Sequence, residues 1–173
     1  MTQTNSWLDK DTVKKGNIGE DIVRDYLIKM GYVPYEPVIG IAHPFDKLCA
    51  SRDKKTIFIA EVKTKARRNK YPDTGINISH YNDYKNIQTK HNIHVFLFFV
   101  DEMLKKVYGE FLIKLEDPLK IIVNGYEINY PLRFKGIIYF PIEKMRDIGD
   151  LNKQQVADLK NLSTRSYDYE VTQ

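Results

Sequence analysis

The spacing of apolar residues changes along the chain, and each change predicts an element. From Asp11 to Met30, apolar side chains recur at helical spacing, with Asp11 placed to cap the helix and Gly31 placed to end it. The run from His94 to Val100 is short, apolar and aromatic, which is typical of a strand buried on both faces. We therefore expect a helix near the N-terminus and a buried strand near the middle of the chain.

The remaining segments predict a mixed α/β fold in which helices flank a central sheet. Further strands are expected over residues 32–41, 44–51, 56–65, 106–114, 120–123, 127–130 and 136–140, and further helices over residues 80–90 and 151–162. Ser79 and Asp150 are the expected caps of these two helices. Two prolines place the 32–41 strand at a sheet edge, and Asn124-Gly125 predicts a hairpin turn. The class is α/β, with extra C-terminal strands and a terminal helix.

Composition narrows the class of protein. The 173 residues suit one compact domain, expected over residues 11–162 with flexible ends at 1–10 and 163–173. No apolar stretch is long enough to cross a bilayer, and the N-terminus lacks the regions of a secretory signal. Cys49 stands alone, so the chain cannot form an intramolecular disulfide, which favours the cytoplasm. The histidines lack zinc-site spacing, and no glycine-rich loop for ATP phosphates is present.

Two acidic residues are expected to face each other across the hairpin of the second and third strands. A turn centred between Asp53 and Lys54, with a loop of either two or four residues, places Asp46 directly opposite Glu61. Lys63 projects to the same face because strand side chains alternate. Opposed carboxylates repel, and a divalent cation such as Mg²⁺ removes that repulsion, since it prefers oxygen ligands. An exposed Glu-Lys pair on a surface strand is the structural alternative.

Glu20 is expected to extend this group from the first helix. It lies at the margin of the apolar stripe, and Gly16 and Gly19 flank it on the same side. Both glycines weaken the helix, so they indicate the close approach of another backbone or of a phosphate. An ordinary solvated glutamate beside a flexible first turn is the alternative.

A cluster of positive charge follows Lys63 and predicts phosphate contacts. Although the formal net charge is only +4, five of the eight residues from Lys63 to Lys70 are basic. A solvated loop is the alternative. On the next helix, Tyr81 and Tyr84 could stack on bases or pack in the core, and Lys85 would extend the positive surface. The predicted nucleic-acid-binding residues are Lys65, Arg67, Arg68, Lys70, Tyr81, Tyr84 and Lys85.

Three segments resemble the PD-(D/E)XK nuclease superfamily, in particular Holliday-junction resolvases and related small endonucleases. These are Lys15 to Glu20, Pro44 to Asp46, and Glu61 to Lys63, although Phe45 separates the proline from the aspartate. The resemblance covers roughly residues 14–100 and implies a restriction-endonuclease-like core. It also implies Asp46, Glu61 and Glu20 as ligands of Mg²⁺, with Mn²⁺ as a substitute, and Lys63 as the catalytic lysine.

The sequence therefore predicts a Mg²⁺-dependent nuclease that hydrolyses phosphodiester bonds, with DNA as the expected partner. Cutting both strands of a duplex usually calls for two sites, so a homodimer is a further expectation. The first alternative is a nucleic-acid-binding or regulatory module with the same fold and no catalysis. The second is a protein-interaction domain whose working surface lies in residues 101–141.

Overall fold

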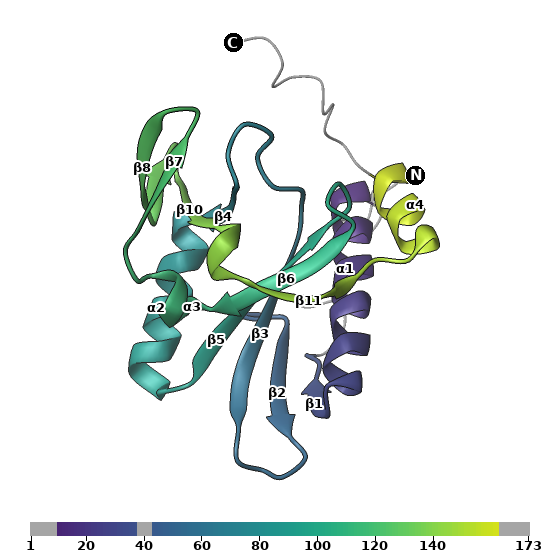
Figure 1. Ribbon diagram of the computed structural model, residues 1–173. Coiled ribbons are helices and arrows are strands. Elements are labelled where there is room, and N and C mark those ends of the chain that lie inside the picture. The colour runs from purple at the N-terminus through teal and green to yellow at the C-terminus, as the bar shows by residue number, and fades with distance from the viewer. Residues whose placement is uncertain (1–9, 38–42, 163–173) are drawn as a thin grey trace, which may run out of the picture.

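The computed structural model describes residues 10–37 and 43–162 (Figure 1). Most of the expected flexible end at 1–10, all of that at 163–173, and residues 38–41 of the strand expected over 32–41 lie outside the described residues. Four α-helices are α1 (Asp11–Lys29), α2 (Ile78–His91), α3 (Leu112–Leu115) and α4 (Lys153–Asn161), and η2 (Ile142–Lys144) is a short 3₁₀ helix. None of the helices in the described part is long and apolar enough to cross a membrane.

A six-stranded mixed sheet forms the centre of the molecule, as the sequence predicts. Its strand order is β1-β2-β3-β5-β6-β11. The strands are β1 (Tyr32–Tyr35), β2 (Lys47–Ser51), β3 (Ile57–Thr64), β5 (His94–Asp101), β6 (Lys106–Phe111) and β11 (Arg146–Asp150). Only β3 and β5 pair in parallel, and the other neighbours are antiparallel. The predicted edge position of the first strand is confirmed, since β1 is the first strand of the sheet.

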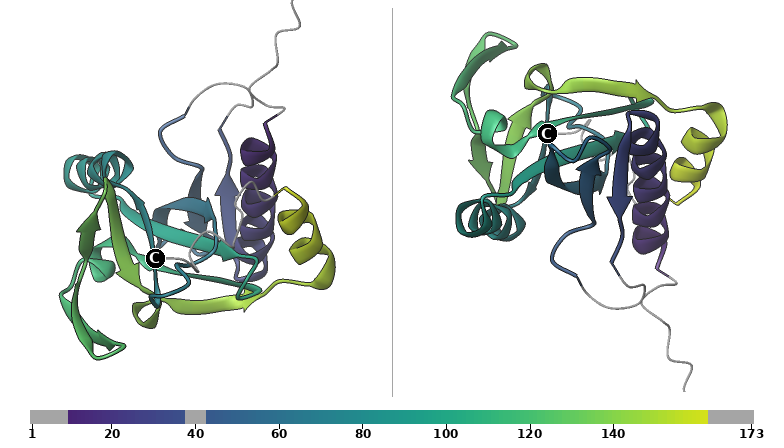
Figure 2. Two further views of the ribbon diagram at one scale, coloured as in Figure 1. Left: turned by 90° about the horizontal axis from the view of Figure 1, so that it is seen from above. Right: turned by 90° about the horizontal axis from the view of Figure 1, so that it is seen from below.

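Helices cover both faces of this sheet, so the predicted α/β class is confirmed. α1 and α4 lie together on one face, while α2 and α3 lie on the other (Figures 1 and 2). Alternate residues of β3 enter the two hydrophobic cores: Phe58, Ala60 and Val62 pack with α1, and Ile59 packs with α2. The predicted buried strand is β5, whose residues are buried on both faces from Val95 to Asp101.

Two smaller sheets extend the face that carries α2. One has the order β4-β10-β9, and the other is the β7-β8 hairpin. Their bounds are β4 (Asp73–Asn77), β9 (Leu132–Phe134), β10 (Ile137–Pro141), β7 (Leu119–Val123) and β8 (Tyr126–Tyr130). Asn124 and Gly125 both have positive φ, so the predicted turn between β7 and β8 is confirmed.

Several predicted boundaries and caps need correction. Asp11 is the first helical residue instead of the cap. α2 begins before Ser79, with Asn77 as its cap residue. The last helix is capped by Asn152 instead of Asp150, because its side chain accepts from the backbone of Gln155 and completes a capping box. Residues 73–77, for which the sequence predicts no strand, form β4, which pairs with the distant β10.

Candidate active site

The β2-β3 hairpin has the register that the sequence predicts. The Ser51 N–H donates to the Thr56 carbonyl at 2.9 Å, which closes a four-residue loop and excludes the two-residue alternative. Lys47 then pairs with Ala60, the last pair of the ladder. Asp46 lies one residue before β2, and Glu61 lies one residue beyond Ala60 on β3. The two acids therefore occupy the next opposed positions, where β2 leaves the sheet.

The Asp46 carboxylate binds the edge of β3 at the position where β2 no longer pairs with it. Its Oδ2 accepts from the Val62 N–H at 2.7 Å, a ladder donor that β2 no longer reaches. This hydrogen bond fixes Asp46 against the exposed edge of β3. It also explains why Asp46 is held beside Glu61 although Asp46 lies outside β2.

Glu61 and Lys63 form a buried pair on the face that carries α2. Only 4% of Glu61 is exposed, and its Oε1 accepts from the Lys63 Nζ at 2.6 Å. The ammonium of Lys63 also lies 5.9 Å from the centre of the Tyr84 ring. The second carboxylate oxygen of Glu61, Oε2, is buried and makes no hydrogen bond. The predicted placement of Lys63 on the face of Glu61 is confirmed.

The acidic groups perturb one another. Burial, followed by the charges of Glu61 and Glu20, raises the pKa of Asp46 to about 7. Burial, followed by the charge of Glu61, also raises the pKa of the Tyr84 hydroxyl. Without a cation, the site therefore disfavours ionisation of Asp46 near neutral pH.

The donors present fit a hard divalent cation. Asp46 supplies a carboxylate whose ionised form is destabilised, and Glu61 supplies a buried oxygen without a partner. Mg²⁺ typically takes one or two protein carboxylates and completes its shell with water and phosphate oxygens. Among the residues that the structure describes, no three Asp, Glu, His or Cys side chains lie close enough together to hold a metal. The structure thus brings Asp46 and Glu61 together but does not gather Glu20 with them into one ligand group.

Glu20 is held instead by a lysine that the sequence reasoning missed. The Lys47 ammonium lies 3.4 Å from Glu20 Oε2 and 3.0 Å from Glu36 Oε1. Lys47 is only 2% exposed, so its charge depends on these two partners. The sequence could have indicated that Lys47 is buried, because it lies two residues before apolar Cys49 and so shares its strand face. In the structure, that face packs on α1.

The two glycines of α1 behave differently. A Cβ added to Gly19 would overlap the hydroxyl of Thr64 on β3, so β3 approaches closely there, but through a side chain and not through the predicted backbone or phosphate. Within the described part of the chain, no atom lies within 4 Å of a Cβ added to Gly16, so no backbone approaches it closely. Gly19 thereby lets α1 approach the end of β3 and places Glu20 next to the hairpin.

Much of the predicted phosphate-binding segment serves the fold. Arg68 donates two hydrogen bonds to the fully buried Asp73, at 2.6 and 2.5 Å, and the Lys65 ammonium donates to the Gly75 carbonyl at 2.8 Å. The assignment of Arg68 as a phosphate contact is therefore corrected, because releasing its guanidinium would leave Asp73 buried without its cation. Arg67 and Lys70 remain as predicted contacts.

The predicted base contacts on α2 also need correction. Tyr81 and Tyr84 are buried in the core beneath the α2 face, so neither ring presents a surface for a base, and the packing alternative holds. The Tyr81 hydroxyl donates to Glu116 at 2.5 Å, and Lys85 pairs with the other oxygen of the same carboxylate at 2.7 Å. Glu116 follows α3, which no local pattern placed beside α2.

Comparison with known proteins gives similarity to solved structures alone. No family model matches the chain, and no curated protein matches it. A solved structure that it resembles is Hjc, a Holliday junction resolvase from the archaeal hyperthermophile Archaeoglobus fulgidus. The two share 11% sequence identity with a TM-score of 0.48, over 75% of this chain and 90% of the other.

Proposed function

We propose that this protein is a divalent-metal-dependent nuclease that hydrolyses phosphodiester bonds of nucleic acid, with DNA as the expected substrate. The observation that carries the proposal is the pair of carboxylates, half-buried Asp46 and buried Glu61, with the Lys63 ammonium 2.6 Å from Glu61. Such a pair destabilises a metal-free fold, and a cation between the two acids would relieve the repulsion. Asp46 and Glu61 are the proposed ligands, and Glu20 could contribute through a water molecule.

Each side chain has a role that follows from its placement. Bound to Asp46 and Glu61, Mg²⁺ or Mn²⁺ would polarise the phosphate and supply a water of lowered pKa. The Val62 N–H keeps Asp46 oriented. Lys63 is fixed by Glu61 and can orient the attacking water or offset the charge that builds on the phosphate oxygens. Arg67 and Lys70, on the loop that follows β3, are the proposed contacts to the phosphate backbone.

The alternative is a nucleic-acid-binding module without catalysis. Binding alone needs cations on the surface. It gives no reason for Asp46 and Glu61 to lie together, with Lys63 paired to Glu61. The two functions differ in a simple respect. A binding module would show no cleavage product with any divalent metal, and its affinity would not depend on Asp46 or Glu61.

Cleavage of DNA by variants of the site tests the proposal. Asp46→Asn, Glu61→Gln and Lys63→Met should each reduce the rate by about 100-fold or more, because each removes a group that acts on the reacting phosphate. The measurement is nicking of supercoiled plasmid, with single-stranded and branched DNA as further substrates, in Mg²⁺, Mn²⁺ and EDTA.

Asp21→Asn is the matched control. Asp21 neighbours Glu20 on α1, and its side chain is 61% exposed in a surface pair with Arg24, so this variant should cleave as the wild type does. Circular dichroism melting checks that all variants are folded. Wild-type cleavage by any of the three site variants, or no cleavage by the folded wild type with either metal, would contradict the proposal.

A further inference from the structure

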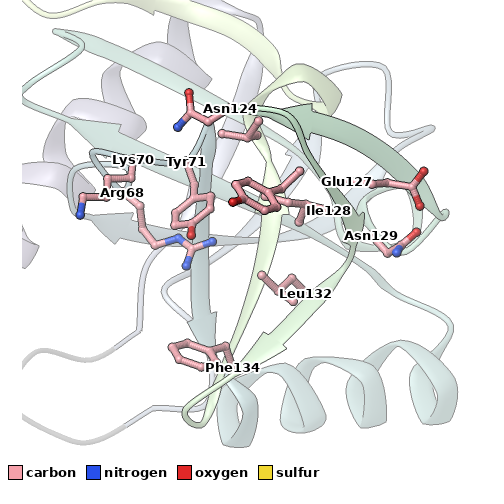
Figure 3. Close-up of a pocket in the computed structure, with 11 residues that line it drawn as sticks. Arg68, Lys70, Tyr71, Asn124, Glu127, Ile128, Asn129, Leu132 and Phe134 are labelled. Carbon is pink, nitrogen blue, oxygen red and sulfur yellow. The ribbon is translucent and has the colours of Figure 1, made fainter. Parts of the chain in front are cut away.

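A second site lies beside the β7-β8 hairpin. A pocket of about 540 Å³ lies between this hairpin, β9 and the loop that follows β3 (Figure 3). Three aromatic residues (Tyr71, Tyr126 and Phe134) and Asn124 are among the residues that line it. The volume is in the range of pockets that hold small ligands. None of the residues assigned to the active site lines this pocket.

The aromatic rings of this pocket are exposed to an extent that folding alone does not explain. Tyr126 is 77% exposed and Phe134 is 51% exposed. Tyr126 pairs with Val123 across the hairpin, and both line the pocket. Ile122, the neighbour of Val123, projects to the opposite face of the hairpin because strand side chains alternate. Exposed rings gathered around a concave surface indicate a ligand that stacks on them.

Cations accompany these rings. The Arg68 guanidinium stacks on the Tyr71 ring at 4.1 Å, but its charge is paired with that of Asp73, so Arg68 orders the ring and is not a phosphate contact. The Lys135 ammonium lies 5.3 Å from the Phe134 ring, and Lys70 lines the pocket from the loop. An aromatic platform with positive charge at its rim complements a flat base that is joined to phosphates.

The loop that follows β3 connects the proposed active site with this pocket. β3 carries Glu61 and Lys63 and ends at Thr64. Lys70 and Tyr71, on the loop between β3 and β4, line the pocket. A strand of nucleic acid that runs from Lys63 along this loop would therefore reach the pocket.

We propose that this pocket binds an unpaired nucleotide of the nucleic acid that the active site cleaves. The base stacks on Tyr126 and Phe134, the Asn124 amide hydrogen-bonds its edge, and Lys70 and Lys135 attract the flanking phosphates. This inference rests on the proposed function for the identity of the ligand. It adds a substrate class, namely nucleic acid with a single-stranded segment next to the scissile bond.

Binding without cleavage tests the pocket. A fluorescein-labelled oligothymidylate is titrated with the full-length protein in EDTA, and fluorescence anisotropy gives the dissociation constant. Tyr126→Ala and Phe134→Ala should each weaken binding by about 5- to 100-fold, as expected for the loss of one stacking partner. Tyr126→Phe keeps the ring and should bind as the wild type does. A blunt duplex should be bound with little change by all of these variants.

Ile122→Ala is the matched control, since Ile122 is 75% exposed on the outer face of the same hairpin and its loss should not change binding. Unchanged affinity in both Tyr126→Ala and Phe134→Ala would overturn the proposal, as would a wild-type protein that does not bind the oligothymidylate. The wild type could fail to cleave while the pocket variants still bind the oligothymidylate more weakly than it does. That result would contradict the nuclease proposal and support the nucleotide pocket.

Discussion

At the scale of single residues, the ionisation of Asp46 is the property that most clearly separates a metal site from a surface ion pair. Burial and two neighbouring carboxylates raise the pKa of Asp46 from 3.8 to about 7. A surface acid paired with a lysine would have a lowered pKa instead. The arrangement therefore has a consequence for stability that can be measured without any substrate.

The metal-free protein should lose stability as pH rises from about 4 to about 7, because the unfolded chain releases the Asp46 proton while the folded chain retains it. Above about pH 7 both forms are ionised and this contribution becomes constant. The loss due to Asp46 is at most about 4 kcal/mol. The measurement is urea unfolding in EDTA across this pH range.

Asp46→Asn provides the comparison, since other carboxylates titrate in the same range. The free energy of unfolding of the wild type relative to this variant should fall with rising pH. A difference that is constant, or that grows with pH, would show that Asp46 is not held among like charges.

The residues of the hairpin could be predicted because register is a local property. The turn and the alternation of side chains decided that Asp46 faces Glu61 and that Lys63 shares its face. Lys47 and Arg68 could not be predicted in the same way. Their partners, Glu20 and Glu36 for the first and Asp73 for the second, are brought close by packing of α1 on β2 and by pairing of β4 with β10.

At the scale of elements, the packing of α1 on β3 positions Glu20. Gly19 is the point of closest approach, because its missing Cβ leaves room for Thr64. Thr64 is the residue after Lys63, so any shift of the helix at this point would disturb the end of the strand that carries the proposed catalytic lysine.

Two alanine substitutions on the same helix should have opposite effects. Gly16→Ala should raise the free energy of unfolding by up to about 1 kcal/mol, since alanine favours helix and the added methyl group meets no neighbour. Gly19→Ala should lower it by about 1 kcal/mol or more, because overlap with Thr64 outweighs the same gain in helix propensity. Urea unfolding followed by circular dichroism measures both. A stabilised Gly19→Ala variant would contradict the close packing of α1 on β3.

Elements with strong local signals could be predicted, and those defined by distant partners could not. The periodicity of α1, the apolar run of β5 and the Asn124-Gly125 turn each carry their own signal. β4, β9 and β11 are short or polar, and they become strands only by pairing with β10 or β6. The segment predicted as a strand over residues 106–114 instead turns into α3 after Phe111, where Leu112 and Leu115 bury their side chains at helical spacing.

At the scale of the whole molecule, the central sheet carries the proposed active site, and the β7-β8 hairpin and β9 carry the proposed nucleotide pocket. The sheet and α1 place the acidic site just before β2 begins, where β3 is paired with β5 but no longer with β2. The β7-β8 hairpin and β9 extend the α2 side of the sheet, and the loop after β3 runs between the two regions (Figure 1). One bound strand could therefore contact the site for hydrolysis and the aromatic pocket at the same time.

The most direct test of the central claim is where a divalent ion binds. Crystals of the protein soaked in MnCl₂ should show an anomalous difference peak between Asp46 and Glu61, within about 2.0–2.6 Å of an oxygen from each. Asp46→Asn crystals treated in the same way should lose that peak. No manganese at the wild-type site, or manganese bound elsewhere without contact to either carboxylate, would contradict the account.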